Sequence, residues 1–131
     1  MQLFTDGASR NNPGEAGGGI FLKDGDNEWT KAIYLGKKTN NEAEYLALIE
    51  GLKLAKDKGA KELELFMDSQ LIIKQLRGEY KVKKNHLIPL FNEARTLLFA
   101  FSKWTATHVL RAQNKEADRL ANLAIDSHDS A

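Results

Sequence analysis

Apolar and polar residues alternate through the first third of the chain in a way that predicts three β-strands. Residues 2–9 form the first of these segments and place Asp6 inside a strand. Residues 18–23 and 28–35 have a similar pattern, and the Asp-Gly-Asp-Asn sequence between them favours a hairpin. Another turn is expected over residues 10–14, which contain Asn-Asn-Pro-Gly.

Helical periodicity and short apolar runs predict the remaining elements. Residues 40–58 have the spacing of an amphipathic helix, which Gly59 ends. The apolar run over 63–67 is typical of a buried parallel strand, and Ser69 is placed to cap a short helix after it. The other elements expected are a basic loop over 78–85, a helix over 87–99, a strand over 103–109, a helix over 114–126 and a frayed tail over 127–131.

This order of elements predicts an α/β fold in which a mixed sheet carries helices on both faces. The length of 131 residues fits one domain over residues 1–131, with 127–131 as a flexible tail. No apolar run approaches the roughly 20 residues of a membrane-spanning helix. Because the N-terminus also lacks the pattern of a signal peptide, a cytoplasmic location is expected.

Composition excludes some kinds of chemistry and leaves others open. The absence of cysteine excludes disulfides, zinc–thiolate sites and thiol nucleophiles. The net charge of +1 weighs against a protein that binds nucleic acid by overall charge alone. It does not weigh against an enzyme with a local basic patch.

Four carboxylates stand out because their predicted positions are unusual for acidic residues. Asp6 lies in a strand, where aspartate is disfavoured, and Asp68 ends an apolar strand. Glu44 falls on the apolar face of its helix, and Asp118 borders the apolar face of the last helix. Carboxylates that point toward an interior repel one another and lose hydration. A bound divalent cation is the simplest way to stabilise such a group.

Three of these carboxylates also have an ordinary structural explanation. Asp68 is placed to cap the helix that follows it, although Ser69 is equally well placed. Asp6 would mark a bend or strand end beside Gly7, and Asp118 would be a first-turn aspartate favoured by the helix dipole. The patterns alone leave these alternatives open.

Glu44 differs from the other glutamates of its helix. Thr39 and Glu42 match a capping box, in which the glutamate reaches back to the backbone amide of the cap residue. Glu42 and Glu50 both fall away from the apolar face, so Glu50 is expected to be solvated. Glu44 has neither explanation and is therefore a candidate for function.

A shared site for these carboxylates would favour particular metals and a particular chemistry. Ligands that are all oxygen atoms favour Mg²⁺ or Mn²⁺ over zinc or copper. Two cations about 3.5–4 Å apart, bridged by carboxylates, are a standard arrangement for phosphodiester cleavage. One cation then generates the attacking hydroxide, and the other stabilises the leaving oxygen.

Four motifs in the chain together suggest a family. They are Asp-Gly-Ala-Ser…Asn-Pro-Gly from residue 6, Thr-Asn-Asn-x-x-Glu from residue 39, Met-Asp-Ser-Gln from residue 67 and Asn-x-x-Ala-Asp-x-Leu-Ala from residue 114. In this order and spacing they resemble type 1 ribonuclease H, over roughly residues 2–126. The resemblance implies a ribonuclease H-like fold, with a five-stranded mixed sheet flanked by helices. It also implies Mg²⁺-dependent endonucleolytic cleavage of the RNA strand in RNA·DNA hybrids.

The resemblance assigns roles to the residues that match these motifs. Asp6, Glu44, Asp68 and Asp118 would be the catalytic, metal-binding carboxylates, with two Mg²⁺ ions per site when substrate is bound and Mn²⁺ as a substitute.

Six further residues would contact the hybrid. Asn12 and Gln70 would contact the RNA strand near its 2′-hydroxyls, the groups that distinguish RNA from DNA. Asn40 and Asn41 would touch bases or sugars. Lys37 and Thr39 would help to hold a DNA phosphate.

The chain departs from the family pattern in two ways, a shortened loop and a missing basic extension. Both features resemble the compact subgroup found in archaea and some bacteria. The loop before the last helix is shortened to residues 108–114, and His108 aligns with the preceding strand, which favours a structural role. Arg111 would contribute charge to substrate binding, although it cannot exchange a proton near neutral pH. The long basic extension of some members is also missing, and only the cluster Lys81–Lys84 offers a modest phosphate contact.

The sequence therefore predicts a monomeric ribonuclease H that acts by two-metal hydrolysis and leaves 5′-phosphate and 3′-hydroxyl ends. Cleavage of double-stranded RNA is a possible side activity. Two alternatives come from other classes, a non-catalytic hybrid-binding module and a metal-dependent phosphatase for small esters. The complete set of carboxylates weighs against the first, and the paired asparagines weigh against the second.

Overall fold

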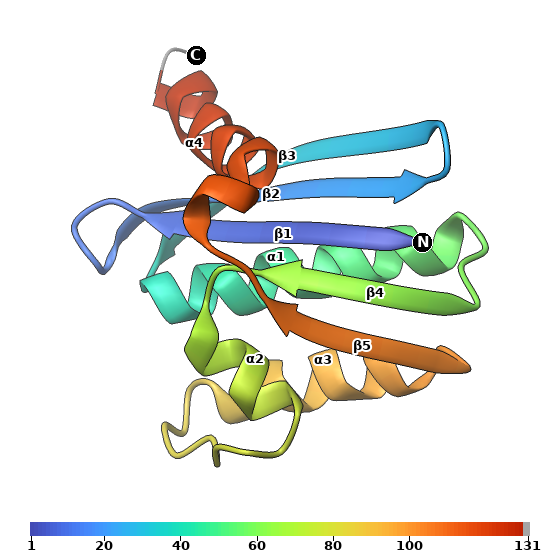
Figure 1. Cartoon of the computed structure of the whole chain (residues 1–131). Coiled ribbons are helices and arrows are strands. Elements are labelled where there is room, and N and C mark those ends of the chain that lie inside the picture. Colours follow the sequence, from blue (N-terminus) through green and yellow to red (C-terminus); the bar gives the residue numbers. More distant parts are fainter. Residues whose placement is uncertain (130–131) are drawn as a thin grey trace.

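In the computed structural model, which describes residues 1–129, five strands form one mixed sheet with the order β3-β2-β1-β4-β5 (Figure 1). The strands are β1 (Gln2–Ser9), β2 (Gly14–Asp24), β3 (Asn27–Lys38), β4 (Glu62–Met67) and β5 (Lys103–His108). The helices are α1 (Asn40–Asp57), α2 (Gln70–Leu76), α3 (Ile88–Phe99), the 3₁₀ turn η1 (Arg111–Gln113) and α4 (Lys115–Asp129).

Strand directions bring the carboxyl ends of three neighbouring strands to one end of the sheet. β1 runs antiparallel to β2 but parallel to β4, and β4 runs parallel to β5. The ends of β1, β4 and β5 therefore lie at the same end of the molecule (Figure 1). In open α/β sheets this is the end at which ligands bind.

Helices cover both faces of the sheet, and glycines in β2 allow them to approach closely. Successive residues of a strand point to opposite faces. A Cβ atom on Gly18 would lie 3.1 Å from the Cβ of Ala47 in α1, whereas one on Gly19 would lie 1.9 Å from the carbonyl oxygen of Ala117 in α4. α1 and α4 thus pack on opposite faces, which confirms the predicted fold class.

Three strands differ from those expected, and one of them, β3, spans Asn27–Lys38 rather than 28–35. β2 begins at Gly14 rather than at Gly18, because glycines carry no side chains whose alternation would indicate a strand. β4 is parallel as predicted, but the expectation of a wholly buried strand is wrong. Glu62 and Glu64 are exposed on one face, and only the other face packs into the core. β4 is thus a half-buried strand, and its open face carries charge.

The C-terminal helix is longer than expected. α4 continues to Asp129, so residues 127–129 are helical rather than frayed. Residues 130 and 131 lie outside the described part of the chain. Among residues 1–129, no helix combines the length and apolar character needed to cross a membrane.

Candidate functional site

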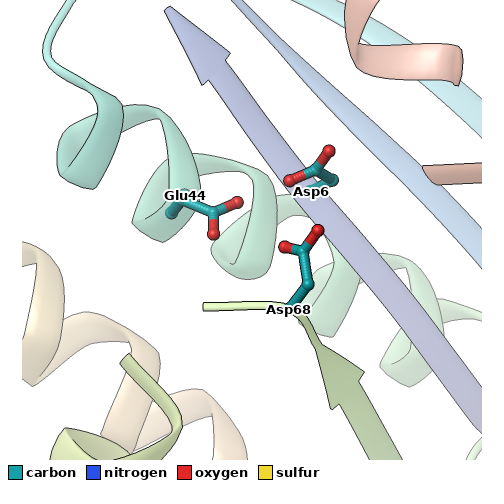
Figure 2. Close-up of side chains that lie close together, drawn as sticks. All are labelled: Asp6, Glu44 and Asp68. Atoms are coloured by element: carbon teal, nitrogen blue, oxygen red, sulfur yellow. The ribbon is translucent and has the colours of Figure 1, made fainter. Parts of the chain in front are cut away.

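Three of the four predicted carboxylates converge at the carboxyl end of the sheet. Asp6 comes from β1, Asp68 follows β4, and Glu44 comes from α1 (Figure 2). Each offers an oxygen atom, and these oxygens all lie within 4.8 Å of one another. Asp6 and Glu44 are each only 7% exposed. Residues far apart in sequence thus form one compact acidic cluster.

Local structure explains how Glu44 reaches this cluster. Thr39 caps α1, and Glu42 completes the predicted capping box by accepting a hydrogen bond from the Thr39 amide at 3.0 Å. Gly7 lets α1 approach β1, since a Cβ atom there would lie 2.2 Å from the carbonyl carbon of Ala43. The Gly7 amide then donates a hydrogen bond to Glu44 Oε1. The prediction that Glu44 is the inward glutamate of α1 is confirmed.

Asp68 is not the cap of the helix that follows it. Ser69 caps α2, and its Oγ accepts a hydrogen bond from the Ile72 amide at 3.3 Å. The Asp68 carboxylate instead points toward the other two acids (Figure 2). The capping alternative is therefore wrong for Asp68.

Burial makes this cluster difficult to ionise. Burial raises the pKa of Asp6 well above its ordinary range, and the charges of Glu44 and Asp68 raise it further. Burial also raises the pKa of Glu44, although the hydrogen bond from Gly7 opposes this effect. The pKa of Asp68 rises because of burial and the nearby charge of Asp118.

The cluster fits a divalent cation of the Mg²⁺ or Mn²⁺ type. Among residues 1–129, no Lys or Arg forms an ion pair with Asp6, Glu44 or Asp68. The charge of Arg111 lowers the pKa of Asp68, but Arg111 forms its ion pair with Asp118, so a cation would supply the charge that balances the three acids. Carboxylate oxygens are the ligands that such cations prefer.

Asp118 of α4 lines the same cleft but is not one of the three acids of the compact cluster, although its side chain contributes to the raised pKa of Asp6. Its Oδ1 accepts hydrogen bonds from Arg111 Nη2 at 3.3 Å and from Asn122 Nδ2 at 3.4 Å. Its charge nevertheless reaches the cluster, because it contributes to the raised pKa of Asp68. The structure therefore places all four predicted carboxylates around one space, with Asp118 as the outer member.

The space between these acids is an open cleft of about 600 Å³. Asn40, Asn41 and Arg111, three of the residues expected to contact the substrate, line it beside the carboxylates. The side chain of Asn40 accepts a hydrogen bond from the Ser9 amide at 3.0 Å, which fixes its orientation.

The other predicted substrate-binding residues lie outside the cleft wall. Asn12 Oδ1 accepts a hydrogen bond from the Asn40 amide at 2.9 Å, so it sits beside the start of α1. Gln70 is exposed at the start of α2, and Lys37 is exposed near the end of β3. Thr39 is occupied as the cap of α1. These positions are next to the cleft rather than within it.

Several residues of the cleft were not identified from the sequence. Arg10 and Asn122 line it, and a hydrogen bond of 3.3 Å joins them. His108, for which the sequence favoured a structural role, is exposed and also lines the cleft. No sequence pattern indicates Arg10 or Asn122, because both are polar residues at positions that also suit plain solvent exposure.

Comparison with known proteins identifies the family. A family model described as reverse transcriptase-like matches residues 4–124. Ribonuclease HI of Halobacterium salinarum is 46% identical over 128 residues, which cover 96% of this chain and 64% of that protein. The ribonuclease H of Hahella chejuensis is 34% identical over 141 residues, which cover 95% of this chain and 93% of that protein. The chain belongs to the type 1 ribonuclease H family.

Solved structures agree with this assignment. The ribonuclease H1 of Halobacterium salinarum superposes with a TM-score of 0.93 at 44% identity, covering 96% of this chain and 97% of that chain. LC11-RNase H1, solved in complex with an RNA/DNA hybrid, superposes with a TM-score of 0.91 at 37% identity, covering 97% of both chains. The chain spans only 35% of a related bifunctional protein of Mycobacterium tuberculosis and 64% of the Halobacterium enzyme. Ribonuclease H domains of this type thus occur inside longer proteins.

Proposed function

We propose that this ribonuclease H-family chain hydrolyses the RNA strand of RNA·DNA hybrids. The observation that carries the proposal is the convergence of Asp6, Glu44 and Asp68 in an open cleft, with their oxygens within 4.8 Å. A structural role does not account for two buried acids and one half-buried acid that form no ion pair with any Lys or Arg among residues 1–129. The relative solved with a bound RNA/DNA hybrid shares the fold at 37% identity, which supports the same class of substrate.

The four carboxylates would hold two Mg²⁺ ions, or Mn²⁺ in their place. When bound, such ions supply an activated water molecule and stabilise the leaving oxygen, which gives 5′-phosphate and 3′-hydroxyl ends. Burial of Asp6 and Glu44 keeps their carboxylates in fixed positions. Asp118, which lines the same cleft, would complete the set of ligands.

The residues around the cleft would hold the duplex. Asn12 and Gln70 would contact the RNA strand, where 2′-hydroxyls distinguish it from DNA. Asn40 and Asn41 would contact bases or sugars at the start of α1. The remaining contacts would be to phosphate groups, which suit cationic side chains and a helix N-terminus, from Lys37, Thr39 and Arg111.

The first test compares substrates and acidic variants. Purified protein is given labelled RNA·DNA hybrid, double-stranded RNA and a small phosphoester, each with and without Mg²⁺ or Mn²⁺. We expect metal-dependent cleavage of the RNA strand in the hybrid, and a loss of about 10³-fold in kcat for Asp6→Asn and Asp68→Asn. Glu50→Gln is the matched control, because Glu50 is a partly exposed glutamate of α1 that is not part of the cleft wall.

Each outcome of this test has a definite meaning. Full activity in either aspartate variant would contradict the site. Binding of hybrid without cleavage would support a binding module instead, and cleavage of the small ester alone would support a phosphatase. Cleavage of double-stranded RNA beside the hybrid would establish the side activity. The monomeric state and the cytoplasmic location stay predictions.

A further inference from the structure

A chain of hydrogen bonds leads from the β1–β2 turn to the outermost carboxylate of the cleft. Arg10 Nη2 donates to Asn122 Oδ1 at 3.3 Å. Asn122 Nδ2 donates in turn to two atoms of Asp118, the backbone oxygen at 3.0 Å and the side-chain Oδ1 at 3.4 Å. Asn122 lies one helical turn after Asp118, so the two side chains share a face of α4.

The direction of these hydrogen bonds follows from the chemistry of the groups. Arg10 can only donate, and an ionised Asp118 can only accept. The Asn122 amide must therefore turn its oxygen to Arg10 and its nitrogen to Asp118. A second contact holds Arg10, whose Nη1 lies 2.7 Å from Asp126 Oδ1. The orientation of Asn122 is thus set from both sides.

Asn122 is a firmer support for Asp118 than Arg111 is. The Arg111 side chain is 77% exposed, and exposed ion pairs of this kind contribute little. Asn122 is half-buried, and its nitrogen is also held by the backbone oxygen of Asp118. Both donors lie on Oδ1, so neither of them occupies Oδ2. The arrangement fixes one oxygen of the carboxylate, and the other carries neither of these donors, so that it would be available to a cation.

We propose that Asn122 is a positioning residue for Asp118, and that Arg10 acts through Asn122. The inference rests on the proposed function in one respect, the role of Asp118 as a metal ligand. It adds that the one proposed ligand outside the compact cluster depends on a partner from its own helix. Groups that orient metal ligands in this way commonly change metal affinity or activity by about 10–100-fold when they are removed.

The test uses metal binding as well as catalysis. Asn122→Ala removes the amide at a helical position that alanine suits well. We expect the Mn²⁺ concentration that gives half of the maximal thermal stabilisation to rise about tenfold, and kcat on the hybrid at fixed Mg²⁺ to fall by about the same factor. KM for the hybrid should stay unchanged. Glu116→Gln is the matched control, since it breaks an exposed ion pair of α4 with Arg119 and should change none of these values.

Two other outcomes would overturn the proposal. A higher KM with an unchanged Mn²⁺ titration would mean that Asn122 contacts the substrate directly. A lower melting temperature with no change in Mn²⁺ dependence or kcat would mean that Asn122 only holds α4 in place. If the unmodified protein cleaves no hybrid, the proposed function fails, but the Mn²⁺ titration still decides the role of Asn122.

Double variants test whether Arg10 acts through Asn122 and Asn122 acts through Asp118. In an Asp118→Asn background, Asn122→Ala should cause no further change in Mn²⁺ dependence, because its effect passes through Asp118. Likewise, Arg10→Ala combined with Asn122→Ala should be no worse than Asn122→Ala alone. Additive losses in either combination would show that the residues act separately, and would overturn the proposed order.

Discussion

The buried acidic side chains at the carboxyl end of the sheet destabilise the fold when they are ionised, and the rest of the fold must offset this effect. Asp6 is buried beside Glu44 and close to Asp68, and its ionised form is disfavoured by lost hydration and by their charges. Asp6 belongs to β1, the central strand of the sheet, so it cannot move into solvent without disrupting the fold. Without a metal, ionisation of the cluster therefore opposes folding.

The sign of this effect gives a pH-dependent prediction. The pKa of Asp6 is raised in the folded state, so between its ordinary value near 4 and the raised value the folded state binds more protons than the unfolded state. The contribution of Asp6 to the free energy of unfolding of the metal-free protein should therefore fall as the pH rises above about 4. Asp6→Asn should weaken this fall and stabilise the metal-free protein near pH 8 by about 1–2 kcal/mol.

Thermal unfolding in EDTA, recorded from pH 5 to pH 9, checks this prediction. Added Mn²⁺ should stabilise the unmodified protein and should have little effect on Asp6→Asn. An Asp6→Asn protein that is less stable than the unmodified one at pH 8 in EDTA would mean that the carboxylate supports the fold rather than straining it.

At the scale of elements, the position of α2 depends on one buried polar contact. Tyr45 of α1 donates a hydrogen bond to Gln75 Oε1 of α2 at 2.5 Å, and both side chains are buried. Tyr45 follows Glu44 in sequence, and α2 directly follows Asp68 and Ser69. The contact thus links the two segments that carry two of the three clustered acids.

Removal of this hydrogen bond should destabilise the protein measurably. Tyr45→Phe keeps the ring but leaves Gln75 Oε1 buried without its donor, which should lower the free energy of unfolding by about 1–3 kcal/mol. Tyr80→Phe is the matched control, because Tyr80 is 49% exposed and should change stability by less than about 0.5 kcal/mol. Urea unfolding followed by circular dichroism measures both values. Equal values for the two variants would contradict the assignment.

The sequence predicted those features that depend on local periodicity. Glu44 was separated from Glu42 and Glu50 by helical phase alone, and the capping box at Thr39 was visible within four residues. Other features depend on contacts between distant segments, and no local pattern reports them. Gln75 looks like an ordinary helical glutamine until Tyr45, thirty residues away, is placed beside it.

The dependence on contacts between distant segments also explains the other features that the sequence did not reveal. Arg10 and Asn122 meet across 112 positions of the chain, so neither has a signal within its own segment. The glycines at the start of β2 conceal the strand because strand alternation is read from side chains, which glycine lacks. The glycines of β2 matter in relation to the helices on both faces of the sheet, since a side chain on Gly19 would collide with the backbone at Ala117 of α4 and one on Gly18 would crowd Ala47 of α1.

At the scale of the whole molecule, the net charge is only +1, whereas the proposed substrate is a polyanion. Hybrid binding would therefore depend on where the cations lie rather than on how many there are. The segment between α2 and α3 lies at the same end of the sheet as the cleft (Figure 1). Val82 of this segment is buried in the core, while Lys81 and Lys83 on either side of it are exposed. The segment is thus anchored with its cations directed outward.

Replacement of these lysines should weaken substrate binding without affecting the chemistry. With Lys81, Lys83 and Lys84 changed to Gln, we expect KM for the hybrid to rise and kcat to stay the same. Each lost phosphate contact should also lower the slope of log KM against log salt concentration by about 0.9, because fewer counterions are released on binding. Steady-state kinetics between 50 and 200 mM salt, roughly the range in which such effects are large, would measure this slope. An unchanged slope would mean that the segment is only a solvated loop. The matched control changes three exposed lysines at the opposite end of the sheet, namely Lys56, Lys61 and Lys103.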